Sequence, residues 1–208
     1  MPAVIVDYDV GNLRSVQKAV EKTGARTLVS SNPADVLSAE ALILPGVGAF
    51  GECMANLGKY GLLNPVREYL RSGKPFLGIC VGYQLLFEES DEFGPITGLN
   101  VFPGKCVRFS FPKESRAKIP HMGWNQARIT KKSRLFEGIA DGTDFYFVHS
   151  YFPIPGADIV CATTEYAGQT FASAVENGNI FATQFHPEKS QRAGLAVLAN
   201  FARVAGLV

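Results

Sequence analysis

Short apolar runs alternate with helical patterns in the first half of the chain. Four runs have the length and composition of buried strands, at residues 3–8, 26–30, 41–44 and 75–79. Apolar side chains also recur at helical spacing, at Leu13, Val16, Ala19 and Val20 and again at Leu62, Leu63, Val66 and Leu70. Alternation of this kind predicts a parallel sheet with helices on both sides.

From about Gly104 onward the pattern changes to closely spaced strand-like runs. They occur at residues 106–110, 145–151, 159–165, 170–175 and 180–184. The dipeptide Asn177-Gly178 is a hairpin turn signal, so antiparallel pairing is expected here. Beyond Pro187 a closing helix is expected, because apolar residues repeat three and four apart at Leu195, Leu198, Ala199 and Ala202. We predict one α/β domain over residues 1–208, with a mixed, mostly parallel central sheet flanked by helices and an additional antiparallel strand-rich part.

The composition narrows the classes of function. Apolar residues make up 47% and charged residues 19%, which is typical of a folded globular protein. Twenty basic and nineteen acidic side chains leave a net charge of +1, so neither nucleic acid nor an anionic membrane is an expected partner. No signal peptide or membrane span is apparent. The four cysteines form no CxxC pair, and we expect free thiols in a reducing cytoplasm and no metal site.

Cys80 stands at a sequence pattern typical of a nucleophile. The segment 75–87 runs from an apolar strand through Gly-Ile-Cys-Val-Gly into a helical pattern, which has the form of a nucleophile elbow with cysteine in place of serine. A sharp strand-to-helix turn strains the central residue, and flanking glycines leave room for it. Unpaired N–H groups at the start of the helix favour the thiolate. Core packing does not need these glycines, so we interpret Cys80 as reactive and Cys53, Cys106 and Cys161 as core residues.

A thiolate nucleophile needs a proton carrier, and histidine suits that task near neutral pH. The chain has three histidines. His186 is followed two residues later by Glu188, which can fold back across the intervening proline and accept a hydrogen bond from the imidazole. A structural or solvated histidine is the alternative. His121 and His149 have no adjacent carboxylate, so the predicted triad is Cys80, His186 and Glu188.

Two segments, Gly-Ile-Cys-Val-Gly-Tyr-Gln at 78–84 and Gln-Phe-His-Pro-Glu at 184–188, resemble the class I, triad-type glutamine amidotransferases. Five segments in order narrow the resemblance to the glutaminase subunits of imidazole glycerol phosphate synthase: residues 7–13, 44–50, 120–125, 146–151 and 184–190. The resemblance covers essentially the whole chain. It implies the class I glutamine amidotransferase fold and the same triad, with Cys80 as nucleophile, His186 as general base and acid, and Glu188 as the residue that orients His186.

The resemblance also implies roles around the triad. The loop Pro45-Gly46-Val47-Gly48 matches the family's oxyanion loop, so Val47 and Gly48 are expected to form an oxyanion hole together with the N–H group of Val81. Glycines in this loop let a peptide plane flip, so the oxyanion hole can form only when the enzyme is activated. The expected glutamine-binding residues are Gln84, Ser150 and Tyr151, with strand-end packing as the alternative for Tyr151.

The implied reaction is hydrolysis of L-glutamine to glutamate and ammonia through a thioester on Cys80, without a metal or organic cofactor. The implied partner is a barrel-shaped cyclase subunit that uses the ammonia in histidine biosynthesis, forming a heterodimer in the cytoplasm. Aromatic and Met side chains are enriched at interfaces. Our hypothesis for the docking face therefore comprises Asn12, Met122, Trp124, Tyr146 and Lys189.

Three alternatives stay open at this point. A cysteine peptidase would use the same amide chemistry, but Gln84 and the amidotransferase-like second half disfavour it. A catalytically silent scaffold would retain the binding face alone, which the complete set of triad residues disfavours. A glutaminase could also serve pyridoxal phosphate, purine or aminobenzoate synthesis, and the segments Pro-Gly-Val-Gly and His-Met-Gly-Trp-Asn favour the imidazole glycerol phosphate enzyme over these.

Overall fold

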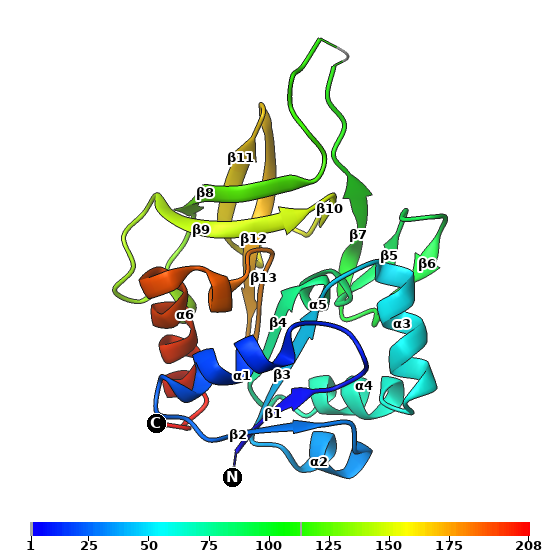
Figure 1. The fold of residues 1–208 in the computed structure, drawn as a ribbon, viewed down its shortest axis with the longest axis vertical. Coiled ribbons are helices and arrows are strands. Elements are labelled where there is room, and N and C mark those ends of the chain that lie inside the picture. The colour runs from blue at the N-terminus through cyan, green and yellow to red at the C-terminus, as the bar shows by residue number, and fades with distance from the viewer. Residues whose placement is uncertain (1, 113) are drawn as a thin grey trace.

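The computed structural model describes residues 2–112 and 114–208 and places their strands in two sheets (Figure 1). The larger sheet has nine strands in the order β2 (Thr27–Ser30), β1 (Ala3–Val6), β3 (Ala41–Gly46), β4 (Phe76–Cys80), β13 (Ile180–Thr183), β12 (Gln169–Asn177), β11 (Val160–Tyr166), β8 (His121–Ile129) and β9 (Thr143–His149). The smaller sheet has the order β10 (Tyr151–Pro153), β7 (Phe102–Arg108), β5 (Phe87–Ser90) and β6 (Ile96–Thr97).

The larger sheet has a parallel half and an antiparallel half. Strands β2, β1, β3, β4 and β13 pair in parallel, whereas β13, β12, β11, β8 and β9 pair antiparallel. The hairpin between β12 and β13 turns at Gly178, whose φ is +56°. The mixed sheet is therefore confirmed, and its antiparallel part continues the parallel part through β13 in one sheet.

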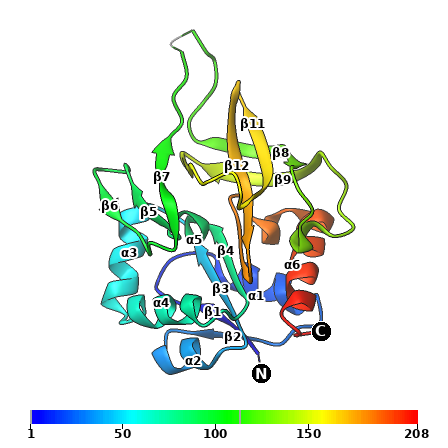
Figure 2. The same cartoon turned by 180° about the vertical axis from the view of Figure 1, so that it is seen from behind.

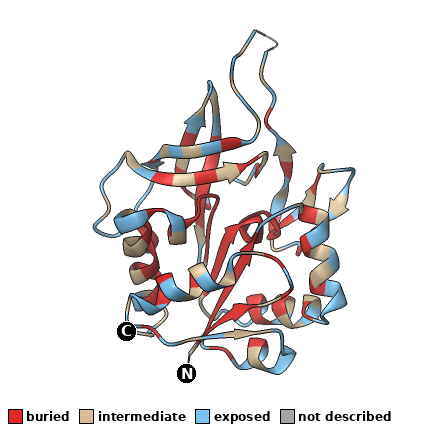
Figure 3. Cartoon of the chain, viewed as in Figure 1, coloured by how far each residue is buried: buried red, intermediate tan, exposed pale blue. Residues whose placement is uncertain are grey.

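The parallel strands are buried because helices cover them. Every residue of β1, β3 and β4 is buried (Figure 3). The helices are α1 (Leu13–Glu21), α2 (Pro33–Ser38), α3 (Phe50–Lys59), α4 (Leu63–Arg71), α5 (Val81–Gln84) and α6 (Gln191–Val204). Helix α1 packs against α6 and α2 packs against α4, and the parallel strands run between these two groups (Figures 1 and 2). The closing helix and the apolar faces of α1 and α4 are confirmed.

Several elements were not expected from the sequence. Helices α2 and α3 were missed. Asn32 caps α2 by accepting a hydrogen bond from the N–H group of Ala34, and the buried face of α3 consists of Phe50, Cys53 and Leu57. Strands β5, β6 and β8 were also missed. In β8 the inward positions include a histidine, a glycine and an asparagine, so its alternation is not visible as an apolar pattern.

The expectation of one continuous strand over residues 145–151 was wrong. The run divides at Ser150 into β9, which belongs to the larger sheet, and β10, which belongs to the smaller one. The carbonyl of Ser150 accepts a hydrogen bond from the N–H group of Phe109 at 3.0 Å, which starts the pairing of β10 with β7. The apolar pattern does not show this break because both strands bury aromatic residues.

Candidate active site

The carboxyl ends of β3, β4 and β13 meet at one edge of the sheet because these strands are parallel neighbours. Cys80 is the last residue of β4, and α5 begins at the next position. Its φ of 54° and ψ of −109° give the strained backbone expected of an elbow. A Cβ atom on Gly82 would lie 1.8 Å from the carbonyl oxygen of Leu44, and one on Gly78 would lie 2.7 Å from that of Gly82. Both glycines are therefore required.

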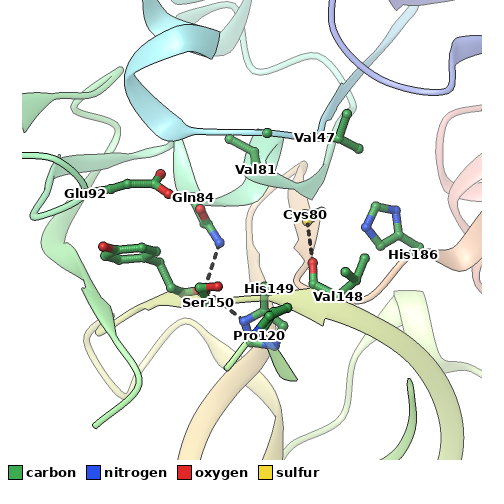
Figure 4. A pocket seen from close by; sticks show the side chains of 12 residues that line it. Val47, Cys80, Val81, Gln84, Glu92, Pro120, Val148, His149, Ser150 and His186 are labelled. Carbon is green, nitrogen blue, oxygen red and sulfur yellow. Dashed lines mark hydrogen bonds between the residues drawn. The ribbon is translucent and has the colours of Figure 1, made fainter. Parts of the chain in front are cut away.

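His186 follows the end of β13 and forms a hydrogen-bonded pair with Glu188. Nδ1 of His186 lies 2.8 Å from Oε1 of Glu188, and the two side chains are only 2% and 3% exposed. Burial lowers the pKa of His186, but the proximity of Cys80 and the Glu188 carboxylate outweigh it and raise the pKa to about 10. Nε2 of His186 has no hydrogen-bond partner within residues 2–112 and 114–208, and the ring lies beside Cys80 (Figure 4).

The main chain holds His186 firmly against β9. Its N–H group donates to the carbonyl of Tyr146 at 2.9 Å, and its own carbonyl accepts from the hydroxyl of Ser190 at 2.7 Å. Ser190 also accepts a hydrogen bond from the N–H group of Tyr146 at 2.9 Å. The imidazole is thus positioned from both sides of the short helix η2 (Pro187–Lys189).

A pocket of about 260 Å³ lies over Cys80 (Figure 4). Its lining contains all but one of the residues expected for catalysis, the oxyanion hole and glutamine binding: Val47, Gly48, Cys80, Val81, Gln84, Ser150, Tyr151 and His186. The exception, Glu188, lies behind His186 and contacts it. This volume and this mixture of polar and apolar groups suit a small polar molecule.

The loop between β3 and α3 forms one wall of this pocket. The hydroxyl of Tyr8 donates to the carbonyl of Pro45 at 2.5 Å, and Sγ of Cys53 donates to the carbonyl of Val47 at 3.6 Å. In a trans peptide the N–H points opposite to the carbonyl, so the N–H group of Gly48 points away from Cys53. Gly48 has a φ of +90°, which only glycine adopts without strain.

Amide side chains connect the opposite wall with the nucleophile. Nε2 of Gln84 donates to the carbonyl of Tyr151 at 2.9 Å and to Oε1 of Gln184 at 3.1 Å. Nε2 of Gln184 in turn donates to Sγ of Cys80 at 3.8 Å. The carbonyl of Val148 lies 3.8 Å from the same sulfur.

Sequence reasoning missed some residues of this site, foremost Glu92 and Gln184. Glu92 lines the pocket, and its Oε2 accepts a hydrogen bond from the N–H group of Phe50 at 2.7 Å. It lies in the acidic run 88–92, and nothing local distinguishes it from a solvated charge. Gln184 had a signal in the sequence, because it opens the segment Gln-Phe-His-Pro-Glu that also carries His186 and Glu188. His149, not assigned to the triad, also lines the pocket.

Four of the five residues of the hypothetical docking face form one surface cluster. We call Met122, Trp124, Tyr146 and Lys189 the aromatic patch. Met122 and Trp124 are 62% and 48% exposed on β8. The ring of Trp124 lies 6.0 Å from that of Tyr146, the residue opposite it on β9, and Nζ of Lys189 lies 5.9 Å from the Tyr146 ring.

Asn12 is exposed but has another local role. Its Oδ1 accepts a hydrogen bond from the N–H group of Ser15 at 3.2 Å and so caps α1. Helix α1 contacts η2, which carries Lys189. Asn12 is therefore near the edge of the aromatic patch.

The other three cysteines are buried and free. Burial raises the pKa of Cys53 to about 12 and that of Cys161 to about 12, and it raises the pKa of Cys106 further. They are poor nucleophiles for this reason. In the described part of the chain, no three His, Cys, Asp or Glu side chains are grouped to hold a metal ion, and no helix has the length and apolarity to cross a membrane.

Comparison with known proteins is consistent with this geometry. The family "Glutamine amidotransferase class-I" matches residues 4–205. A protein of Syntrophotalea carbinolica named imidazole glycerol phosphate synthase subunit HisH is 52% identical over 202 residues, covering 95% of this chain and 98% of its own length. A protein of Aquifex aeolicus with the same name is 47% identical over 206 residues, covering 99% and 98%.

Among solved structures, one chain of PurLQS from Thermotoga maritima superposes with a TM-score of 0.72 at 20% identity, covering 98% of both chains. A structure described as a glutamine amidotransferase gives a TM-score of 0.71 at 21% identity, also covering 98% of both chains. At this identity the two structures support the fold alone. From the family match and the two relatives together, the chain belongs to the class-I glutamine amidotransferases, within the family of the HisH subunits of imidazole glycerol phosphate synthase.

Proposed function

We propose that this chain hydrolyses L-glutamine to glutamate and ammonia and passes the ammonia to the cyclase subunit of imidazole glycerol phosphate synthase, in histidine biosynthesis. The observation that carries the proposal is the arrangement of a strained Cys80 and His186 in one small pocket, with Glu188 hydrogen-bonded to the histidine. The names of the relatives support the choice of partner.

In the first half of the reaction, the Cys80 thiolate attacks the side-chain carbonyl carbon of glutamine and forms a tetrahedral oxyanion. His186, held as an imidazolium by Glu188, then gives its proton to the departing nitrogen. Ammonia leaves, and a glutamyl thioester remains on Cys80. In the second half, His186 takes a proton from water, the resulting hydroxide attacks the thioester, and glutamate and the thiolate are released.

The oxyanion needs N–H donors at the place where negative charge develops. Val81, at the start of α5, and Gly48, in the loop after β3, line the pocket, and their N–H groups are the donors we propose, with Val47 placing the second of them. Loss of one such donor typically costs ~10²- to 10³-fold in rate. Movement of the loop at Gly48 would therefore act as a gate.

The remaining lining suits the amino-acid end of glutamine. Glu92 lies across the pocket from His186 (Figure 4) and offers a carboxylate to the α-ammonium group. Gln84 provides polar atoms from α5, Ser150 provides them from the link between β9 and β10, and Tyr151 provides them from the start of β10. A carboxylate that closes one end of a small pocket suits a free amino acid better than an extended peptide, which disfavours the peptidase alternative.

The aromatic patch is our proposed centre of the cyclase interface, with Asn12 at its edge. Trp, Tyr and Met anchors are enriched at interfaces, and Tyr146 also bonds to the main chain of His186. A partner seated there would cover the active site, which keeps ammonia from being protonated in open solution. A cytoplasmic location fits the four free cysteines.

The test is glutamate release from L-glutamine by the chain alone, then with the cyclase partner and its nucleotide ligand, with Cys80→Ala as the control. We expect activity that the partner stimulates strongly and that the variant lacks. Absence of activity in a demonstrated complex would refute the proposal, and activity retained by Cys80→Ala would refute the role of the cysteine.

A further inference from the structure

A buried pair of histidines lies directly behind the proposed glutamine-binding wall. We propose that His121 and His149, both neutral and both carrying their proton on Nδ1, are positioning residues that hold the carbonyl of Tyr151, and through it Gln84, in place for glutamine binding. This inference rests on the proposed function and adds two residues to which the triad assigns no part.

The two rings belong to an unbroken series of hydrogen bonds. Nδ2 of Asn125 lies 3.2 Å from Nε2 of His121, and Nδ1 of His121 lies 3.2 Å from Nε2 of His149. Nδ1 of His149 lies 2.8 Å from the carbonyl oxygen of Tyr151. That oxygen also accepts from Nε2 of Gln84 at 2.9 Å, so the series ends in the pocket.

The partners at the two ends determine where the protons are. A carbonyl oxygen only accepts, so His149 must donate from Nδ1, and its Nε2 is then the acceptor for His121. His121 must therefore also donate from Nδ1, which leaves its Nε2 to accept from Asn125. The second N–H of Asn125 donates to the carbonyl of Glu165 at 2.8 Å, and its Oδ1 accepts from the N–H group of Gln126 at 2.8 Å. This is the one arrangement of protons in which every donor and acceptor of the series has a partner.

The surroundings keep both rings uncharged. His121 and His149 are 3% and 6% exposed. The ring of Tyr166 stacks on His121 at 4.1 Å, and Phe171 lies 4.9 Å from His149. Burial lowers the pKa of His121 to about 4 and that of His149 to about 3. Aromatic neighbours offer no counter-charge to an imidazolium, so the neutral forms are the stable ones.

Tyr151 needs this support because of its place in the fold. Ser150 bonds to Phe109 of the neighbouring chain segment, and the next residue along an antiparallel strand directs its own carbonyl away from that neighbour. The Tyr151 carbonyl therefore points toward Gln84 and His149 rather than into the ladder of β10 and β7. Without His149, the buried carbonyl oxygen of Tyr151 would lose one of its two hydrogen-bond donors. Gln84 would then bond to a carbonyl that is no longer held in one position.

The first test is the tautomer of each ring, measured from the imidazole nitrogen shifts of the ¹⁵N-labelled chain at pH 7.5. We expect both rings to carry the proton on Nδ1, although neutral imidazole in water prefers Nε2. A proton on Nε2 of either ring would overturn the proposal. This readout does not depend on any activity of the chain.

The second test compares His149→Leu with His149→Asn in the complex with the cyclase subunit. Asn keeps an N–H donor near the position of Nδ1, whereas Leu has a similar size and no donor. We expect His149→Leu to raise the KM for glutamine about tenfold, as loss of one hydrogen bond to a buried acceptor implies. The kcat should change less, and His149→Asn should recover most of the loss.

Two results would contradict the positioning role: an unchanged KM in His149→Leu, or equal behaviour of the Leu and Asn variants. If His149→Leu does not fold, the tautomer measurement on the wild-type chain decides the proposal, because it needs no variant. Failure of the proposed function is distinguishable, since the wild-type complex would then release no glutamate.

Discussion

Substitution of Gly82 by alanine tests the link between the packing of the elbow and catalysis. The added Cβ atom would lie 1.8 Å from the carbonyl oxygen of Leu44, whereas real Cβ atoms essentially never approach a heavy atom within 3.0 Å. The obstacle is the main chain of β3, which is paired with β4 in the middle of the sheet. A side-chain rotation cannot relieve the contact, so either the strand or the elbow must move.

The expected cost follows from the identity of the obstacle. Overpacking against movable side chains typically costs ~1–3 kcal/mol. Here the obstacle is a main-chain oxygen that cannot rotate away. We therefore expect Gly82→Ala to lower the free energy of unfolding by at least about 3 kcal/mol, the upper end of that range. For a chain of this size that loss corresponds to a melting temperature lower by roughly 6–12 °C. A shift of about 1 Å between Cys80 and His186 would also reduce glutamine turnover by on the order of 10²-fold.

Differential scanning calorimetry and glutamate release measure the two effects. Gly58→Ala is the matched control, because Gly58 is exposed in α3 and an added Cβ atom meets nothing within 4 Å. It should stabilise the chain by up to about 1 kcal/mol, since alanine favours the helix over glycine. A Gly82→Ala chain that melts and turns over like the wild type would show that the close contact does not constrain the elbow.

Three further predictions follow from the site and its surface. Glu188→Gln should bring the pKa of His186 down from about 10 and reduce turnover by at least about 10²-fold; an unchanged pH profile would contradict the orienting role. Trp124→Ala should weaken binding of the cyclase subunit by about 2 kcal/mol in a calorimetric titration. Iodoacetamide labelling of Cys80 in the free chain is the control and should not change, and an unchanged affinity would exclude Trp124 from the interface. In the unfolded chain His121 and His149 bind protons below pH 6.5, whereas in the folded chain their pKa values are about 4 and about 3. The free energy of unfolding, measured by urea denaturation, should therefore decrease as the pH is lowered from 6.5, by roughly 2.5 kcal/mol from each histidine at pH 4.5. Replacing either histidine by Gln should flatten this dependence.

The parts of the site that could be predicted from sequence are those determined locally. The elbow depends on Gly78, Cys80 and Gly82, which are close in the chain, and the His186–Glu188 pair spans two residues across a tight turn. The parallel strands were recognisable because burial on both faces requires continuous apolar runs.

The other parts depend on contacts between distant segments. Glu92 reaches the pocket because β5 belongs to the second sheet, and its bond to Phe50 spans 42 positions of the chain. His121 and His149 meet because β8 and β9 pair in one register. The break at Ser150 leaves no local signal, since the side chains on both sides remain suitable for a strand.

Tyr146 separates two tasks between its main chain and its side chain. The carbonyl and N–H group hold His186 and Ser190, whereas the ring lies in the aromatic patch with Trp124 and Lys189. Because any residue except proline supplies both backbone groups, the side chain at this position can change without releasing His186. With the aromatic patch as the proposed interface, a different side chain at position 146 would alter the preference for a partner while the main-chain hydrogen bonds that hold His186 stay the same.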